Sequence, residues 1–348
     1  MSINATLSKQ IQKLIDTEQV FVYYRKAGES TGNSFTQQNT EVYHTSNFSE
    51  AGFVMTGFDL KSTKAILIPL DKSEKAVFEF SSSDETQVNT VLKNEKNKEN
   101  HIAIVAKAIA FIKNRNAEKI VISRTQKQVI DRDKIGEIYI KLLQTYPNAM
   151  VYIWQHPKIG LWLGATPEKL VQTNNKQYKT MALAGTQQYK ENCTWKTKEI
   201  DEQQFVTDYV TEQLKPISEN INIGNSHTVK AGHLAHIRTD ISGKLSPSFN
   251  IKNLINQLHP TPAVCGTPRE AAKDFIIQNE GYNRLFYTGF LGELNLNSKS
   301  DLSVNLRCLQ VLDNKAILYI GGGITKDSDP KREWEETQNK AKIIRKIL

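Results

Sequence analysis

The feature that most constrains this chain is a strand-like run, a glycine triplet and a helix start that follow one another near its C-terminal end. Residues 316–320 form a short apolar run that contains β-branched side chains, which predicts a buried strand. Residues 321–323 are glycines, and without Cβ atoms they allow backbone N–H groups to approach an anion closely. Ser328 or Asp329 can then cap a helix that opens at Pro330. We therefore expect a strand, a candidate anion site and a helix in direct succession.

The helix predicted after these glycines carries charged side chains on one face. Glu333, Glu336 and Lys340 are spaced i, i+3 and i+7, so they share one side. A second pair with the same spacing, Glu199 and Glu202, lies near the start of another strongly periodic helix. Four carboxylates from two distant helices suit a hard cation such as Mg²⁺ and do not suit zinc, which prefers His and Cys. A solvated helix face is the alternative for either pair alone.

Composition and charge exclude several classes of protein. The chain has 348 residues, 39% hydrophobic and 24% charged, which is ordinary for a globular protein with a sizeable core. No apolar run reaches the length of a membrane span and the polar N-terminus does not resemble a signal peptide, so we expect a cytoplasmic protein without a membrane partner. The three cysteines are far apart, which predicts reduced core thiols. The net charge of +8 comes from scattered lysines, which predicts a small dianionic substrate or a solvated basic surface and no nucleic-acid partner.

The first 100 residues are the least informative part of the chain. Residues 8–17 predict a helix and residues 21–25 a strand, followed by a polar loop up to about residue 40. Two apolar segments, 52–58 and 65–70, predict two strands of a meander. The polar stretch 81–100 predicts a connector.

Two side chains in the rest of the chain are candidates for proton transfer. Lys119 begins a predicted strand, where lysine is normally solvent-facing; in a pocket, burial or nearby cations would lower its pKa and make it a base. Glu168 follows a Gly/Pro turn at the edge of a strand, where a surface carboxylate is the simple interpretation. If Glu168 is partly buried, it can hold a proton and act as a general acid.

Other residues are candidates for binding carboxylates. A predicted strand ends in Gly185 and Thr186, whose backbone N–H and hydroxyl could grip a carboxylate. His236 forms a His-x-x-His pair with His233, but no third ligand lies at metal spacing, so a structural or substrate-facing histidine is expected. Arg307 lies inside an apolar run and should meet a carboxylate. That run, 303–312, and the run 284–294 predict two adjacent antiparallel strands.

Eight motifs in a fixed order give a resemblance to a known family. They are GATPEKL, LAGT, KEIDE, HLAHIRT, LHPTPAVCGTP, YTGFLGEL, LRC and GGGITKDSDPKREWEETQNK. This order resembles the chorismate-utilising enzymes, which include isochorismate synthase, salicylate synthase, anthranilate synthase component I and aminodeoxychorismate synthase component I. The resemblance is dense from about residue 117 to 346. It implies one large α/β (α+β) domain of antiparallel sheets packed face to face with helices outside. Residues 1–100 would form a degenerate N-terminal part of that fold, and residues 101–348 the chorismate-binding catalytic part.

The resemblance also implies roles at the metal and at the reacting atoms. Glu202 and Glu336 would bind Mg²⁺ directly, and two further glutamates would act nearby or through water. Lys119 would activate water as the base, and Glu168 would protonate the departing C4 hydroxyl. The two further glutamates are Glu199 and Glu333.

For the substrate, the resemblance implies that two anionic groups are bound. Gly321, Gly323 and Lys340 would hold the ring carboxylate. Tyr287 and Arg307 would hold the enolpyruvyl carboxylate. The other substrate-binding residues implied are Gly185, Thr186, His236, Ala263, Val264 and Tyr319.

Local residues favour one branch of the family. Ala184 in LAGT stands where aminodeoxychorismate synthases often carry a nucleophilic lysine, so water remains the nucleophile. Lys119 argues against the ammonia-using branches, which need no base to activate water. Salicylate synthases also share Lys119 and Glu168, but tend to carry a more polar residue near Ala263. The expected activity is a Mg²⁺-dependent isomerase that converts chorismate to isochorismate for menaquinone or siderophore biosynthesis, with salicylate synthase as the alternative. We expect a monomer without an obligatory amidotransferase subunit.

Overall fold

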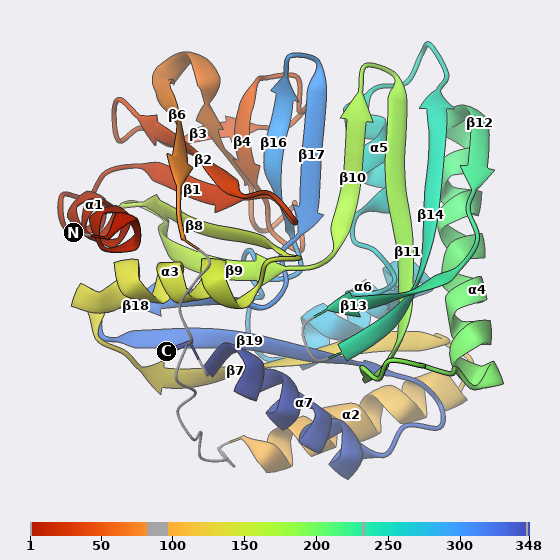
Figure 1. Ribbon diagram of the computed structural model, residues 1–348. Helices are drawn as coiled ribbons and strands as arrows, with labels where there is room; N and C mark the ends of the chain where they lie inside the picture. Colours follow the sequence, from red (N-terminus) through yellow and green to blue (C-terminus); the bar gives the residue numbers. More distant parts are fainter. Residues whose placement is uncertain (1, 82–96, 232–233, 346) are drawn as a thin grey trace.

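Two large antiparallel sheets form the body of this computed structural model, which describes residues 2–81, 97–231, 234–345 and 347–348 (Figure 1). Most strands of the second sheet stand upright in Figure 1 and most strands of the first run across it, so the sheets cross steeply. The first sheet has the order β15 (Gly266–Thr267), β7 (Lys119–Val129), β19 (Lys315–Ile324), β18 (Cys308–Leu312), β9 (Gly160–Thr166), β8 (Met150–His156), β1 (Phe21–Arg25), β2 (Thr31–Gln37) and β6 (Ser73–Glu79).

The second sheet contains the upright strands that end near the first sheet. Its order is β12 (Ser218–Ile223), β14 (Leu234–Leu245), β11 (Gln177–Gln188), β10 (Lys169–Asn174), β17 (Lys299–Val304), β16 (Phe290–Leu296), β4 (Gly52–Met55), β5 (Ala65–Pro69) and β3 (Tyr43–Thr45), and β13 (His227–Ala231) pairs with β14. Strands from the first 100 residues pair with later strands in both sheets, β1 with β8 and β4 with β16.

The main aromatic core lies between the two sheets. Tyr24 of β1 packs against Phe53 of β4, with ring centroids 4.9 Å apart, and both side chains are fully buried. Trp154 and Trp162 of the first sheet pack against Phe286, near the start of the second-sheet strand β16. Each such ring removes a large apolar area from water, which stabilises the contact between the sheets. The expected face-to-face packing of antiparallel sheets with outer helices is confirmed.

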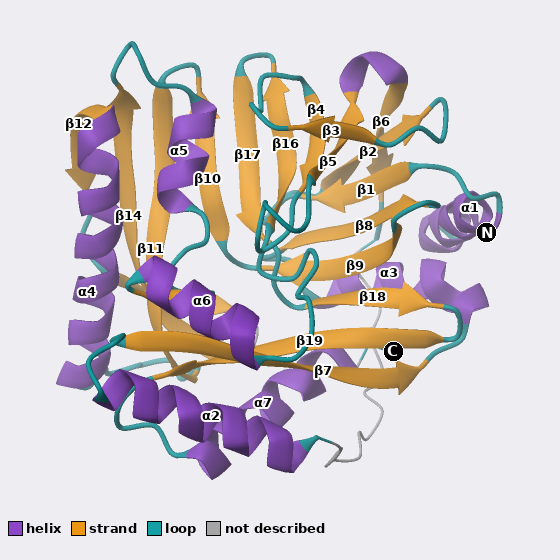
Figure 2. Cartoon of the chain, turned by 180° about the vertical axis from the view of Figure 1, so that it is seen from behind, coloured by secondary structure: helices purple, strands orange, loops and turns teal. Residues whose placement is uncertain are grey.

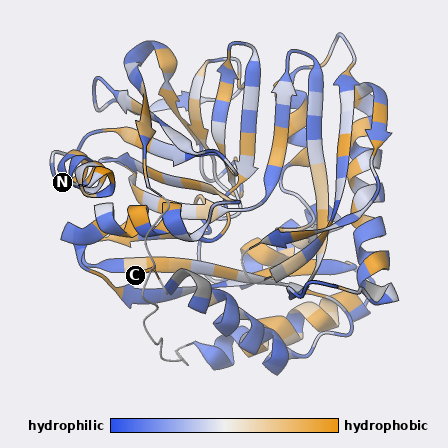
Figure 3. Ribbon diagram, in the orientation of Figure 1, coloured by the Kyte–Doolittle hydropathy of each residue, from blue (hydrophilic) through white to orange (hydrophobic). Residues whose placement is uncertain are grey.

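Helices cover the outer faces of both sheets (Figure 2). On the second sheet, α4 (Thr197–Leu214) packs along β11 and β14, and α5 (Ile251–Leu258) packs on β10. The helices on the first sheet are α1 (Ile3–Asp16), α2 (Lys98–Lys113), α3 (Ile135–Thr145), α6 (Arg269–Asn279) and α7 (Pro330–Arg345). Hydrophobic and hydrophilic residues alternate along the upright strands, and α7 is mostly hydrophilic (Figure 3). No helix in the described ranges is both long enough and apolar enough to cross a membrane.

The N-terminal predictions are mostly confirmed, with one error. The strands at 21–25, 52–58 and 65–70 correspond to β1, β4 and β5, and the first helix begins earlier than predicted. The polar loop predicted up to residue 40 is wrong, because β2 lies in the middle of it. Thr31–Gln37 is polar, but its backbone pairs with β1 on one side and β6 on the other, and this pairing outweighs its low strand propensity. Most of the connector predicted at 81–100 lies outside the described residues.

The run 303–312 is two strands, which corrects the prediction of one. It contains the end of β17 and all of β18, which belong to different sheets. The chain crosses between the sheets at residues 305–307, and Arg307 has a positive φ of 48° there. The other predicted strand, 284–294, begins only at Phe290, because residues 285–288 form a turn. The crossing brings Arg307 to the junction of the two sheets.

Candidate active site

A cavity of about 390 Å³ opens where β7 and β19 of the first sheet meet β11 and β14 of the second. Among the predicted site residues whose side chains the structure describes, all line it except Glu333; the side chain of Thr186 lies outside the described residues. The predicted residues that line it are Lys119, Glu168, Gly185, Glu199, Glu202, His236, Ala263, Val264, Tyr287, Arg307, Tyr319, Gly321, Gly323, Glu336 and Lys340. Side chains from distant parts of the sequence therefore converge on one cavity.

Lys119 points into the cavity from the first residue of β7. Its Nζ donates to Oε1 of Glu202 at 2.8 Å, and its side chain is only 16% exposed. Gly323, which pairs with Val121 on β7, lies beside the lysine side chain, and a Cβ at that glycine would come within 2.9 Å of the Lys119 Cε. The absence of a side chain at position 323 therefore makes room for the lysine.

The three glycines lie within β19, which corrects the prediction that the strand ends before them. They pair with β7 up to Gly323, opposite Val121. None of them has a positive φ, so the role of glycine here is to leave room for neighbouring side chains. A Cβ at Gly321 would lie 2.7 Å from the Tyr287 hydroxyl, and one at Gly322 would lie 3.4 Å from the Glu333 carboxylate. Pairing with β18 stops at Leu318, so the other edge of this stretch is open on the cavity side.

Helix α7 presents its charged face toward these glycines. Pro330 opens the helix and the Asp329 carboxylate caps it, as predicted. Trp334 anchors the helix, because its ring lies 4.4 Å below the guanidinium of Arg124 on β7. Six residues further along the helix, Lys340 donates to the carbonyl oxygen of Gly321 at 3.0 Å.

Helix α4 supplies the second carboxylate pair. Gln203, which is buried, donates to the Ala182 carbonyl and to the Thr239 hydroxyl, both at 3.0 Å. These bonds tie α4 to β11 and β14. They direct the preceding residues of the helix, Glu199 and Glu202, toward the cavity.

The four glutamates have the donor chemistry that a hard cation requires, but each already accepts a bond from the protein. Within the described ranges, no three His, Cys, Asp or Glu side chains gather closely enough to hold a metal as they stand. The bonds run from Lys196 N to Glu199, from Lys119 to Glu202, from Ser328 to Glu333 and from Lys340 to Glu336. Two of the four donors are ammonium groups, which occupy positions suited to positive charge. Oxygen ligands fit Mg²⁺, so the residues are compatible with it.

Glu168 is buried between β9 and β10, where the sequence placed it at a strand edge. It is 7% exposed, and its Oε1 accepts a bond from the Thr261 hydroxyl at 3.3 Å. Burial raises the pKa of Glu168 to about 7, although Thr261 and the charge of Lys119 pull it down. A carboxyl group with this pKa holds a proton near neutral pH and can donate it.

The burial of Glu168 predicts a pH-dependent stability difference. Because its folded pKa of about 7 exceeds the ordinary 4.5, the folded protein should lose stability as pH rises from about 4.5 to about 7. A shift of this size corresponds to about 3 kcal/mol. Glu168→Gln has no ionisable group at this position. The free energy of unfolding of the variant, relative to that of the wild type, should therefore be higher at pH 8 than at pH 5. Urea unfolding at both pH values measures this; an equal difference at both would contradict it.

Arg307 and two tyrosines form one side of the cavity. The rings of Tyr287 and Tyr319 stack with centroids 5.4 Å apart and an interplanar angle of 21°. Arg307 makes no ion pair with any carboxylate of the described residues, so the carboxylate that it is predicted to meet is not one of theirs. Burial lowers the pKa of Arg307, because no anion compensates its desolvation. Its guanidinium lines the cavity and is available to an anionic ligand.

The remaining predicted residues close the cavity from the second sheet and a loop. His236 on β14 lies 2.9 Å from the Gly185 carbonyl through its Nδ1. Burial lowers the pKa of His236 to about 4, so the ring is neutral and does not serve as a cation. Ala263 and Val264 come from the loop after α5. His233, the other half of the His-x-x-His pair, lies outside the described residues.

Several cavity-lining residues were not predicted from the sequence. Val121 is two positions after Lys119 on β7, so strand alternation could have found it. Thr288 lies in a turn and Leu306 in the irregular segment between β17 and β18, and neither carries such a periodic signal. The unpredicted lining residues are Val121, Pro167, Leu183, Ala184, Thr288, Leu306, Ile320 and Gly322.

A wider and more open hollow of about 820 Å³ lies elsewhere, lined by strands of the second sheet and by Asn33 and Lys75 on β2 and β6 of the first. Its walls are mainly exposed lysine and amide side chains of β10, β11, β12 and β17, and no predicted site residue lines it. Ionisable side chains with shifted pKa values converge on the smaller cavity and identify it as the functional site. Cavity volume alone would not have identified the functional site in this protein.

The comparisons with known proteins agree with this cavity and fold. The family model described as chorismate binding enzyme matches residues 2–348. The chain therefore belongs to the family of chorismate-binding enzymes.

Individual proteins of this family are similar to the chain over part of their length. A Pseudomonas aeruginosa protein named salicylate biosynthesis isochorismate synthase is 30% identical over 257 residues, 71% of this chain and 54% of that protein. Isochorismate synthase MenF of Escherichia coli is 32% identical over 197 residues, 54% of this chain and 45% of MenF. The aligned region thus spans about half the length of these relatives. The solved MenF structure matches with a TM-score of 0.79 at 20% identity, covering 94% of this chain and 88% of that one, which shows the fold.

Proposed function

We propose that this protein is a Mg²⁺-dependent isochorismate synthase. The observation that carries the proposal is a buried carboxyl group with a raised pKa, Glu168, facing the same cavity as a lysine, Lys119. This pair supplies the acid and the base that hydration at one ring carbon and loss of hydroxide at another require. The relatives' names, isochorismate synthase in both cases, support the same reaction.

Chorismate would be held by its two carboxylates. Arg307 has no carboxylate partner among the described residues, and with Tyr287 it would bind the enolpyruvyl carboxylate. Lys340 and the open edge of β19 at Gly321 and Gly323 would bind the ring carboxylate. Each of the two carboxylates of chorismate would thus meet one cationic side chain, Arg307 or Lys340.

In the proposed reaction, water attacks C2 of the ring, the double bonds shift, and the C4 hydroxyl leaves. Lys119 takes a proton from the attacking water, and Glu168 gives its proton to the departing C4 oxygen. Lys119 Nζ lies 2.8 Å from Oε1 of Glu202, one of the residues that would hold the cation. The atoms balance, because one water enters and one leaves.

The four glutamates on α4 and α7 would hold the cation, with Glu202 and Glu336 as direct ligands. When bound, Mg²⁺ would neutralise the ring carboxylate and fix its position. The product would enter menaquinone or siderophore biosynthesis. The reaction needs no ammonia, so we propose a single-chain enzyme without an amidotransferase subunit.

Purified protein incubated with chorismate and Mg²⁺ tests this proposal. Isochorismate should appear as chorismate disappears, without pyruvate, and EDTA should stop turnover until Mg²⁺ is restored. Chromatography identifies the products, and a coupled assay measures pyruvate. Salicylate with equimolar pyruvate would indicate a salicylate synthase instead, and activity unaffected by EDTA would contradict the metal requirement.

A further inference from the structure

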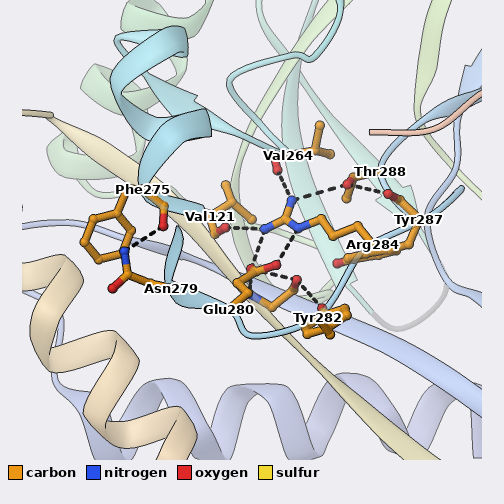
Figure 4. Close-up of polar contacts among 10 residues, drawn as sticks. Val121, Val264, Phe275, Asn279, Glu280, Tyr282, Arg284, Tyr287 and Thr288 are labelled. Atoms are coloured by element: carbon orange, nitrogen blue, oxygen red, sulfur yellow. Dashed lines mark hydrogen bonds and ion pairs between the residues drawn. The ribbon is translucent and has the colours of Figure 1, made fainter. Parts of the chain in front are cut away.

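A buried ion pair between Arg284 and Glu280 lies directly behind the cavity wall (Figure 4). The two side chains are only 2% and 1% exposed. Nε of Arg284 donates to Oε2 of Glu280 at 2.8 Å, and Nη2 donates to Oε1 at 2.6 Å. Burial alone would lower the pKa of Arg284, but the Glu280 carboxylate raises it above its ordinary value. The arginine is therefore held charged in a dry environment.

The other donors of Arg284 all reach residues that line the cavity. Nη1 donates to the Val264 carbonyl at 2.9 Å and to the Thr288 hydroxyl at 3.2 Å. Nη2 also donates to the Val121 carbonyl at 2.7 Å. All five N–H donors of the guanidinium are thus used, and a lysine cannot reproduce this planar arrangement.

Glu280 is fixed to β7 as firmly as the arginine is. Its Oε1 accepts bonds from the backbone N–H of Ser123 at 2.6 Å and from the Ser123 hydroxyl at 2.8 Å. The same hydroxyl lies 2.6 Å from the hydroxyl of Tyr282. One ion pair therefore joins β7, the loop that contains Val264, and the turn at residues 284–288.

These three segments carry the groups assigned to the reaction. Lys119 lies two residues before Val121 on β7, and both line the cavity. Thr261, whose hydroxyl donates to Glu168, belongs to the same loop as Val264, and the Val264 N–H donates to the Thr261 carbonyl. Tyr287 is in the turn itself. A shift of any one segment would change the separation of acid, base and substrate.

The turn also needs an external restraint. Leu285 and Thr288 have positive φ values of 50° and 60°, which are unfavourable for side chains of this size. Such conformations persist where the surrounding structure holds them. The bond from Arg284 to the Thr288 hydroxyl supplies one such restraint.

We propose that Arg284, held by Glu280, is a positioning residue that sets the geometry between Lys119, Glu168 and Tyr287. This inference rests on the proposed function for the roles of those three residues. Arg284 does not line the cavity, so it acts through the segments that it joins.

The substitution Arg284→Lys tests the proposal, because it keeps the charge and removes the forked set of donors. We expect kcat for chorismate to fall at least about tenfold while KM changes little, because small displacements of reacting groups cost rate. Glu280→Gln should act in the same direction. Arg25→Lys is the matched control. Arg25 is also 2% exposed, lies over a phenylalanine ring and donates to two backbone carbonyls, those of Tyr146 and Ala149, but it lies away from the cavity.

Thermal unfolding and kinetics measured together separate positioning from stability. If Arg284→Lys and Arg25→Lys lower the melting temperature alike and both keep the wild-type kcat per folded molecule, the proposal is overturned. Crystal structures of the wild type and of Arg284→Lys test the positioning role without a measurement of activity. An unchanged placement of Lys119 relative to Glu168 would overturn the positioning role, whereas a wild type that leaves chorismate unconverted would contradict the proposed function alone.

Discussion

Replacing Lys119 by methionine should reduce kcat by about 10²–10⁴-fold, the range that a general base contributes. Methionine has a similar length and apolar stem, so the cavity wall should stay intact. The substitution also removes the ammonium that pairs with Glu202, so the remaining carboxylate should still bind the cation. Steady-state assays of isochorismate formation at saturating Mg²⁺ measure the loss.

Lys127→Met is a suitable control for this prediction. Lys127 lies on the same strand, β7, but is exposed and does not line the cavity. It should retain wild-type turnover. A Lys119→Met enzyme that turned over at the wild-type rate would rule out this lysine as the base.

Glu168→Gln should cost a similar factor of about 10²–10⁴ in kcat, because an amide cannot protonate the departing C4 oxygen. Glutamine keeps the shape of the side chain and can still accept the bond from Thr261. Substrate binding should therefore change little, and the loss should appear in kcat with KM nearly unchanged. Glu137→Gln, an exposed carboxylate on α3, provides the control.

The pH dependence gives Glu168 a second test. Only the protonated carboxyl is an acid, and burial sets its pKa at about 7. In the wild type, kcat/KM should therefore fall as pH rises above about 7. The residual activity of Glu168→Gln should lack this decline, and a profile with the same decline in both proteins would assign the titration to another group.

The helical part of the site could be predicted from the sequence because its signals are local. Glu333, Glu336 and Lys340 follow helical spacing after a capped start, and Glu199 and Glu202 do the same on α4. The placement of Glu333 against Ser328, outside the cavity lining, depends on how α7 packs on β19. Helical spacing alone does not predict which residues of α7 face the cavity.

The parts that depend on how strands cross could not be predicted in the same way. The apolar run around Arg307 has the pattern of one strand, yet the chain changes sheets within it, and the arginine faces the cavity without a carboxylate partner among the described residues. The glycines read as a turn because of their freedom in φ, whereas the structure uses them for the space they leave to Tyr287 and Lys119. In both cases the decisive contacts are long-range, so no local propensity reports them.

Polar pairing in the interior was equally hidden from the sequence. Glu280 and Arg284 have the i, i+4 spacing of an ordinary surface pair on a helix. In the structure Glu280 lies just after α6 and Arg284 in the following turn, and both are buried by β7 and the loop at Val264. The burial of this pair is a property of the assembled fold.

The reaction in water enriched in ¹⁸O tests the proposed mechanism at its central step. If Lys119 activates a solvent water for attack at C2, mass spectrometry of the product should show isochorismate heavier by the mass difference between ¹⁸O and ¹⁶O, with the label on the C2 hydroxyl. Isochorismate that carried no label would show that the hydroxyl moved within the substrate, and would contradict the roles of Lys119 as base and Glu168 as acid.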